Sequence, residues 1–212
     1  MIGMEGFVLA GGMSRRMGRD KASLRLGDTT LVERAAKVLS SVADPVYVVG
    51  NIKGVTSLPG ITDIQPIDGK RSSMTGLYTA LSNAKTEWAA ILACDLPFVN
   101  KDLFLRIVSK LEQLENVDDG QSNAVLPKQA DGRIQPLCGL YRVRTCLTEV
   151  KKMTSVKELR LQELVQRINA VVVPNSEFAD ISDAEDLFLN VNTPEDYSRA
   201  VKLAAAKPSG WE

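Results

Sequence analysis

The sequence predicts a single three-layer α/β domain whose central sheet is mostly parallel and contains one antiparallel strand. In the first half, short apolar runs alternate with helical patterns, as in parallel β-α-β units. The runs at 123–128 and 135–142 flank a turn at Asp131-Gly132, which predicts a hairpin and so one antiparallel strand. The chain has 212 residues, enough for one domain but few for two. We assign 1–206 to this domain and 207–212 to a loose C-terminal tail.

The predicted strands are apolar or β-branched runs between turn signals. The run at 87–93 is the clearest, because a strand covered on both faces is apolar throughout. In chain order, strands are predicted at 6–9, 45–50, 61–64, 87–93, 123–128, 135–142 and 170–173.

The predicted helices begin at capping residues. Thr30 with Glu33, and Ser155 with Glu158, fit the capping-box pattern and predict helices at 31–43 and 155–167. The last helix is expected after Thr193, a good N-cap that Pro194 follows. The remaining helices are predicted at 74–84, after Asn100 and at 146–153, and the final one ends near 206.

Composition excludes several kinds of chemistry. The chain has no histidine, which rules out Ser-His-Asp hydrolysis, Cys-His catalysis and His-ligated zinc. The three cysteines, Cys94, Cys138 and Cys146, are scattered, so they indicate a reducing compartment and no metal site. Formal net charge is zero, which favours neither a nucleic-acid nor a membrane partner. Without a signal-peptide pattern or a long apolar run, we expect a cytoplasmic protein.

A glycine-rich loop follows the first predicted strand, from Leu9 to Lys21. Glycines let a backbone approach a ligand closely, and strand ends are where open α/β sheets bind ligands. The loop matches neither the ATPase phosphate loop nor the dinucleotide fingerprint. The loop has many hydrogen-bond donors and only one acidic residue, which favours a polyphosphate as its ligand. The alternative is a basic turn on the surface. The donors are the amides near Ala10, Gly11 and Gly12, together with Ser14, Arg15, Arg16, Arg19 and Lys21.

Other polar residues follow later strands, so they should meet this loop at one sheet edge: Asn51, Asp68 and Asp95. A carboxylate directly after a buried strand needs a cation or strong donors, so Asp95 is a candidate Mg²⁺ ligand, with a helix cap as the alternative. Lys21 is a candidate phosphate ligand that neutralises a leaving pyrophosphate, with a solvated lysine as the alternative. Arg15 is a candidate to share that role.

Four segments resemble the molybdenum cofactor guanylyltransferases, a family within the Rossmann-like nucleotidyltransferases. The opening loop, LAGGMSRRMGRDK at 9–21, alone indicates only a nucleotidyltransferase. CDLPF at 94–98, QPLCGLY at 135–141 and NVNTPED at 190–196 are similar to the narrower family. One segment departs: Ser72–Gly76 stands where the family usually has Gly-Pro-Leu-Ala-Gly, and only the last glycine is kept.

The resemblance implies the Rossmann-like nucleotidyltransferase fold and transfer of GMP from GTP to molybdopterin carrying molybdenum. The resemblance also implies that pyrophosphate is released and that Mg²⁺ is required. Cofactor-insertion or molybdoenzyme maturation proteins are then the expected protein partners. Lys21, Asp95 and Arg15 are then the catalytic residues, and Asp95 the metal ligand. Asn190 and Asn192 are expected near the pterin or the metal, or else as turn formers before the last helix. The residues expected to bind the nucleotide are Leu9, Ala10, Gly11, Gly12, Lys21, Asn51, Asp68 and Asp95.

Two other functions stay open. A cytidylyltransferase or a sugar- or alcohol-phosphate nucleotidyltransferase shares the first motif, although cytidylyl relatives tend to have Leu-Ala-Ala-Gly where this chain has Leu-Ala-Gly-Gly. A non-catalytic nucleotide-binding module is the alternative of another class, and the altered Ser72–Gly76 segment is what keeps it open.

Overall fold

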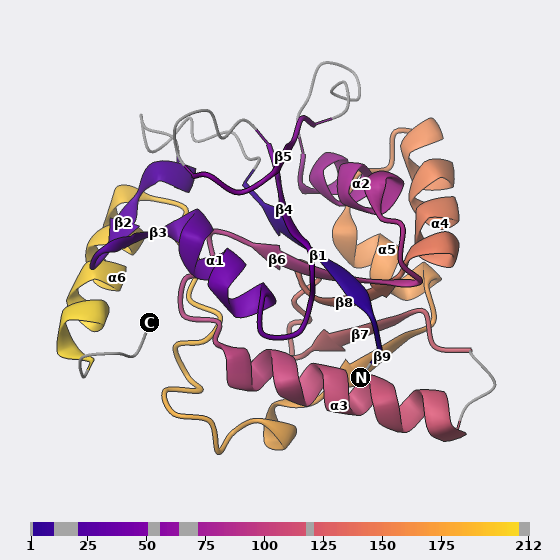
Figure 1. The fold of residues 1–212 in the computed structure, drawn as a ribbon. Coiled ribbons are helices and arrows are strands. Elements are labelled where there is room, and N and C mark those ends of the chain that lie inside the picture. The colour runs from indigo at the N-terminus through magenta and orange to yellow at the C-terminus, as the bar shows by residue number, and fades with distance from the viewer. Residues whose placement is uncertain (1, 11–20, 51–55, 64–71, 118–120, 208–212) are drawn as a thin grey trace.

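A computed structural model describes residues 2–10, 21–50, 56–63, 72–117 and 121–207 (Figure 1). Within them, the central sheet has seven strands in the order β5-β4-β1-β6-β8-β7-β9. The strands are β1 (Met4–Leu9), β4 (Val46–Val49), β5 (Gly60–Ile61), β6 (Trp88–Ala93), β7 (Ala124–Pro127), β8 (Cys138–Arg142) and β9 (Ala170–Val173).

The strand directions confirm the predicted sheet. β8 pairs antiparallel with both of its neighbours, β6 and β7. The pairs β1–β4, β1–β6, β4–β5 and β7–β9 are parallel, so β8 is the strand that runs against the rest. The strand expected at 61–64 is shorter and earlier than predicted, because β5 has only Gly60 and Ile61 in register with β4.

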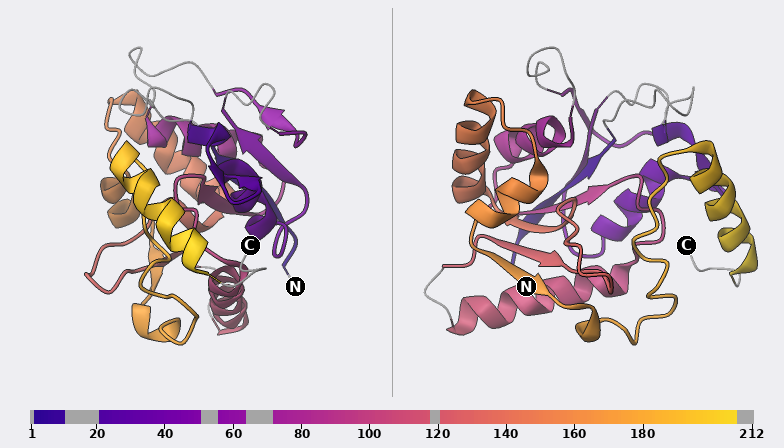
Figure 2. Two further views of the ribbon diagram at one scale, coloured as in Figure 1. Left: turned by 90° about the vertical axis from the view of Figure 1, so that its left-hand side faces the viewer. Right: turned by 180° about the vertical axis from the view of Figure 1, so that it is seen from behind.

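Helices cover both faces of the sheet and make the three layers (Figure 2). On one side lie α1 (Leu31–Leu39) and α3 (Lys101–Val117), with α6 (Pro194–Ala206) beside them. On the other side lie α2 (Ser73–Asn83), α4 (Val143–Ser155) and α5 (Leu161–Arg167). The central strand serves both cores, because Val8 packs on the α1 side while Phe7 and Leu9 pack on the α2 side.

Two of the predicted helix starts are confirmed in detail. Thr30 Oγ1 accepts from the Glu33 amide at 3.2 Å, and the Glu33 carboxylate accepts from the Thr30 amide at 2.8 Å. Asn100 Oδ1 accepts from the Leu103 amide at 3.1 Å and so caps α3. α1, however, ends at Leu39 and not near residue 43.

The predicted helix start at Ser155 is wrong. Ser155 is the last residue of α4, which spans Val143–Ser155 where only 146–153 was expected. Lys157 adopts a left-handed conformation with φ 61°, and the Glu158 amide donates back to the Met153 carbonyl at 2.9 Å. These are the features of a Schellman helix end, so the chain must leave the helix there. The next helix, α5, begins only at Leu161.

A small hairpin was not expected between the opening loop and α1. Its strands are β2 (Arg25–Leu26) and β3 (Thr29–Thr30), and Gly27 turns between them with φ 62°. The 3-10 helix η2 (Lys21–Ser23) precedes it and places Ala22 in the core. The hairpin therefore fixes the chain immediately after the glycine-rich loop.

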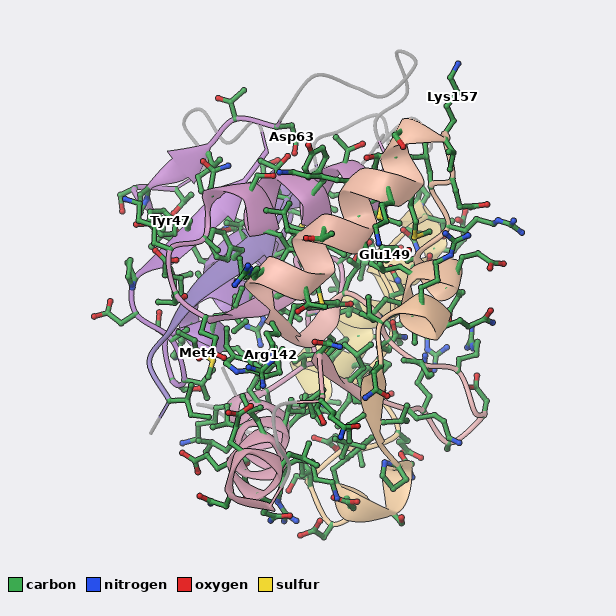
Figure 3. All side chains as sticks on the ribbon, turned by 90° about the vertical axis from the view of Figure 1, so that its right-hand side faces the viewer. Met4, Tyr47, Asp63, Arg142, Glu149 and Lys157 are labelled. Carbon is green, nitrogen blue, oxygen red and sulfur yellow. The ribbon has the colours of Figure 1, made fainter. Side chains whose placement is uncertain are left out.

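The side of α4 is shown in Figure 3, where Arg142 lies between α4 and α3. Its guanidinium pairs with Glu87 and with Glu115 of α3, and it lies 4.7 Å from the centroid of the Trp88 ring. This contact joins β6, β8 and α3.

Two observations bear on the ends and surroundings of the chain. Lys207, the first residue of the predicted tail, pairs with Asp183 and lies 5.4 Å from the Phe98 ring centroid; the rest of that tail is outside the described residues. Among the described helices, none has an apolar stretch long enough to cross a membrane.

We expect Gly139→Ala to destabilise the sheet by about 1–3 kcal/mol, because overpacking a core forces its neighbours apart. A Cβ on Gly139 would lie 2.5 Å from the Val125 carbonyl oxygen and 2.7 Å from Leu126 Cδ2. Urea unfolding measures the loss. Gly76→Ala in α2 is the control, since its Cβ would make only ordinary contacts with Leu9, at 3.7 Å from Cδ1 and 3.9 Å from Cδ2. Equal stability of the Gly139→Ala variant and the parent chain would contradict this packing.

Candidate active site

The carboxyl ends of three neighbouring parallel strands form the edge on which the candidate site lies. Leu9, the last residue of β1, is in register with Val49 of β4 and Ala93 of β6. The ladder continues past the strands, since the Ala10 amide donates to Val49 at 2.9 Å and the Cys94 amide donates to Leu9 at 3.1 Å. The start of the glycine-rich loop and Asp95 are therefore neighbours, as the strand-end rule predicts.

Lys21 reaches into this edge from the start of η2. Its Nζ donates to Asn192 Oδ1 at 2.5 Å, across a separation of 171 residues. The same Nζ lies 4.0 Å from Asp95 Oδ2, and the Lys21 side chain is only 14% exposed. Lys21, Asp95 and Asn192 come from three separate motifs of the sequence, and the fold brings them together.

Asp95 sits directly after β6 between the buried residues Cys94 and Leu96. Burial raises the pKa of its carboxyl, and the Lys21 ammonium only partly opposes that shift. Its side chain keeps 27% of its surface exposed, so it is open to a ligand. In the described part of the chain the side chain that caps α3 is Asn100, so the helix-cap alternative for Asp95 finds no support there.

The two asparagines flank a backbone contact to Asp95. The amide of Val191, between Asn190 and Asn192, donates to the Asp95 carbonyl at 2.9 Å. Both asparagine residues are exposed. The Asn192 side chain contacts Lys21. The segment therefore lies beside Asp95 and Lys21, while the expected role of the two asparagines toward the pterin or the metal stays a prediction.

Several predicted site residues cannot be placed. Arg15, Gly11, Gly12, Asn51 and Asp68 all lie outside the described residues. Their roles therefore remain predictions.

The described residues suit a cation that takes most of its ligands from substrate and water. Among them, no three His, Cys, Asp or Glu side chains gather as a metal cluster. Mg²⁺ typically takes one or two carboxylates and completes its shell with phosphate oxygens and water. Asp95 is a half-buried carboxylate whose charge Lys21 only partly compensates, and an amide oxygen of Asn192 lies nearby, so the pair fits that pattern.

The segment that departs from the family pattern forms the start of α2. Ser72 is the N-cap, and its Oγ accepts from the Thr75 amide at 3.3 Å. The retained Gly76 packs beside Leu9, since a Cβ there would lie 3.7 Å from Leu9 Cδ1. Serine thus supplies a hydrogen-bonded cap at this helix start.

Sequence reasoning missed Asp196 as a residue of the site. Its Oδ2 accepts from the Asn192 amide at 3.0 Å and from the Thr193 amide at 2.9 Å. These bonds lower the pKa of the Asp196 carboxyl, and the nearby Lys21 charge lowers it further. Asp196 ends the family-like segment at 190–196, but its place three residues after Thr193 predicts helix capping and no role in the site.

Comparisons with known proteins show which proteins this chain resembles. Residues 6–177 match the family model described as the MobA-like NTP transferase domain. A protein of Geobacillus sp. (strain WCH70), named "Probable molybdenum cofactor guanylyltransferase", is 29% identical over 204 residues, covering 93% of this chain and 98% of that protein. A protein of the same name from Carboxydothermus hydrogenoformans is 30% identical over 204 residues, covering 94% of this chain and 96% of its own length.

A solved structure shares the fold. It is that of molybdopterin-guanine dinucleotide biosynthesis protein A from Archaeoglobus fulgidus, with a TM-score of 0.75 and 21% sequence identity. The match covers 96% of this chain and all of that one (100%). The three-layer fold predicted from the sequence is therefore shared with a solved structure.

We expect Asp95→Asn to be more stable than the parent chain at pH 7 in the absence of metal. Because folding raises the pKa of Asp95 above its ordinary value of 3.8, the folded state binds the proton more tightly, and stability falls as pH rises through the raised pKa. The amide removes this loss. Urea unfolding between pH 7 and pH 3 measures it, and the advantage should vanish as the pH falls below about 3.8. A less stable variant at pH 7 would mean that the Lys21 pair outweighs burial.

Proposed function

The chain belongs to the MobA-like NTP transferase family and is a nucleotidyltransferase, and from this premise we propose that it transfers GMP from GTP to molybdopterin carrying molybdenum. The products are the guanine dinucleotide cofactor and pyrophosphate. We place the reaction in the cytoplasm and expect cofactor-insertion or molybdoenzyme maturation proteins to take the product.

The observation that carries this proposal is the position of the Lys21 ammonium. It lies between the Asp95 carboxylate and the Asn192 amide oxygen, at the sheet edge where the glycine-rich loop begins. A cation beside a metal-binding carboxylate suits a substrate with several phosphates. Asn192 belongs to the NVNTPED segment, one of those that resemble the molybdenum cofactor guanylyltransferases, and this resemblance supports the choice of acceptor.

The reaction needs charge neutralisation more than proton transfer. A terminal phosphate oxygen of the pterin attacks the α-phosphorus of GTP, forming a new P–O bond. The bond from that phosphorus to the bridging oxygen breaks, and its electron pair leaves with pyrophosphate. The attacking phosphate is already an anion at neutral pH, so no general base is required, in keeping with a chain that has no histidine. Catalysis then depends on positioning two anions and balancing their charge.

The residues divide this work between them. Lys21, with Arg15, neutralises the charge that develops on the leaving pyrophosphate. The loop amides from Ala10 to Gly12 hold the triphosphate, while Asn51 and Asp68 contribute to nucleotide binding. Asp95 would hold Mg²⁺, which when bound supplies further positive charge to the phosphates. Asn190 and Asn192 orient the pterin or the metal.

The assay that tests this function is pyrophosphate release with molybdopterin carrying molybdenum and each of the four nucleoside triphosphates, with and without Mg²⁺. We expect turnover with GTP and Mg²⁺, and little with the other nucleotides. Preferential turnover with CTP would identify a cytidylyltransferase. Turnover with a sugar or alcohol phosphate, and none with the pterin, would show that the acceptor is a different phosphate. GTP binding without any turnover would favour the non-catalytic module.

We expect Lys21→Ala and Asp95→Ala each to lower turnover by about 10²-fold or more, because each removes charge stabilisation from the transition state. Arg19→Ala is the control from the same loop and should change turnover little, because we expect the Arg19 side chain to be solvated and not to contact the phosphates. Thermal unfolding establishes that each variant is folded. Near-normal turnover in a folded Lys21→Ala or Asp95→Ala variant would remove that residue from the catalytic set.

A further inference from the structure

The first turn of α6 lies beside the Lys21–Asn192 contact. Asp196 Oδ2 accepts from two successive amides, those of Asn192 and Thr193, at 3.0 and 2.9 Å. In return, the Asp196 amide donates to Thr193 Oγ1 at 3.1 Å. The bonds to Thr193 form an ordinary capping box, but the bond to Asn192 reaches one residue further back. Helix capping alone does not require that extra bond.

The extra bond bears on the orientation of the Asn192 side chain. Asn192 is exposed, and its side-chain oxygen is the acceptor for Lys21 Nζ. The backbone on one side is fixed by the Val191 amide, which donates to the Asp95 carbonyl. Asp196 fixes the backbone of Asn192 itself. Together these two contacts hold the backbone from which the Asn192 side chain extends to Lys21.

A second contact joins the same turn of α6 to the segment of chain that follows Lys21. The Tyr197 hydroxyl donates to the Arg25 carbonyl in β2 at 2.7 Å, four residues after Lys21 in the chain. Ala200, one turn further along α6, is fully buried in the core. The start of α6 is therefore a rigid element that contacts both the Lys21 segment and the Asn192 segment.

We propose that Asp196 is a positioning residue for the catalytic lysine, acting through Asn192. Its carboxylate holds the Asn192 backbone so that the amide oxygen keeps the Lys21 ammonium in place beside Asp95. Asp196 makes no contact with substrate in this scheme, and its role rests on the proposed function of Lys21. The lowered pKa of the Asp196 carboxyl keeps it charged, which strengthens both of the bonds that it accepts.

The chain offers a matched control for helix capping. Thr193→Ala removes the hydroxyl that accepts from the Asp196 amide, yet leaves both amides that donate to Asp196. Asp196→Ala removes the bonds to Asn192 and Thr193 instead. Both variants weaken the start of α6, so both should lower the melting temperature. Only Asp196→Ala releases Asn192.

The experiment measures kcat, KM for GTP and melting temperature for these two variants, for Asn192→Ala and for the double variant Asn192→Ala with Asp196→Ala. We expect Asp196→Ala to lower kcat/KM on the order of 10-fold, since small misplacements of catalytic groups are costly, while Thr193→Ala stays within about twofold of the parent chain. The double variant should be no slower than Asn192→Ala alone, because Asp196 acts through Asn192.

Two results would overturn the proposal. One is equal loss of kcat/KM in Asp196→Ala and Thr193→Ala, which would leave only a capping role. The other is fully additive loss in the double variant. If Asp196→Ala does not fold, Asp196→Asn carries the test, since a neutral amide oxygen accepts more weakly than a carboxylate. It should lose more kcat/KM than Thr193→Ala, and an equal or smaller loss overturns the proposal.

Lys21→Ala, measured alongside, separates this proposal from the proposed function. If Lys21→Ala loses turnover while Asp196→Ala behaves like Thr193→Ala, only the positioning role fails. If Lys21→Ala keeps normal turnover, the assignment of the lysine fails and the positioning role falls with it.

Discussion

The contact between the Lys21 ammonium, the Asn192 amide oxygen and the Asp95 carboxylate is the interaction on which the site depends. A carboxylate placed after a buried strand loses much of its hydration, which costs free energy. A nearby cation offsets part of that cost. Here the cation comes from the first loop and its second partner from the segment before the last helix. The whole length of the chain must fold before these groups meet.

The last strands and the segment after them explain how the C-terminal motif returns to this edge. β9 lies at the far side of the sheet from β4 and β5. The chain then runs back along α3, where Arg106 pairs with Asp180 and Lys110 pairs with Glu177. Phe178 is fully buried along this path. Exposed ion pairs of this kind contribute little, so the buried aromatic side chain is the stronger anchor.

The sequence predicted the sheet well because its signals are local and strong. Apolar runs located the strands. The turn at Asp131-Gly132 predicted one antiparallel strand, and the structure shows that this strand is β8. Prediction failed where two local patterns compete. Ser155 with Glu158 fits a capping box, yet Lys157 ends the preceding helix in a left-handed conformation without the glycine that usually marks such an end. The two-residue strands of the β2–β3 hairpin are too short for any periodicity to show.

The sequence predicted that residues such as Lys21 and Asp95 share one sheet edge, but it did not predict the contacts that connect them. The rule that parallel strand ends share an edge placed Asp95 beside the first loop, and the family resemblance added Asn192. Neither indicates a hydrogen bond across 171 residues, or that Asp196 holds the Asn192 backbone. Such contacts arise from tertiary packing. Burial raises the pKa of the Asp95 carboxyl, so keeping this group charged costs free energy during folding. In the proposed function, the free energy spent on desolvating Asp95 during folding would leave a negative charge already in place for Mg²⁺, so that binding and reaction would need little reorganisation.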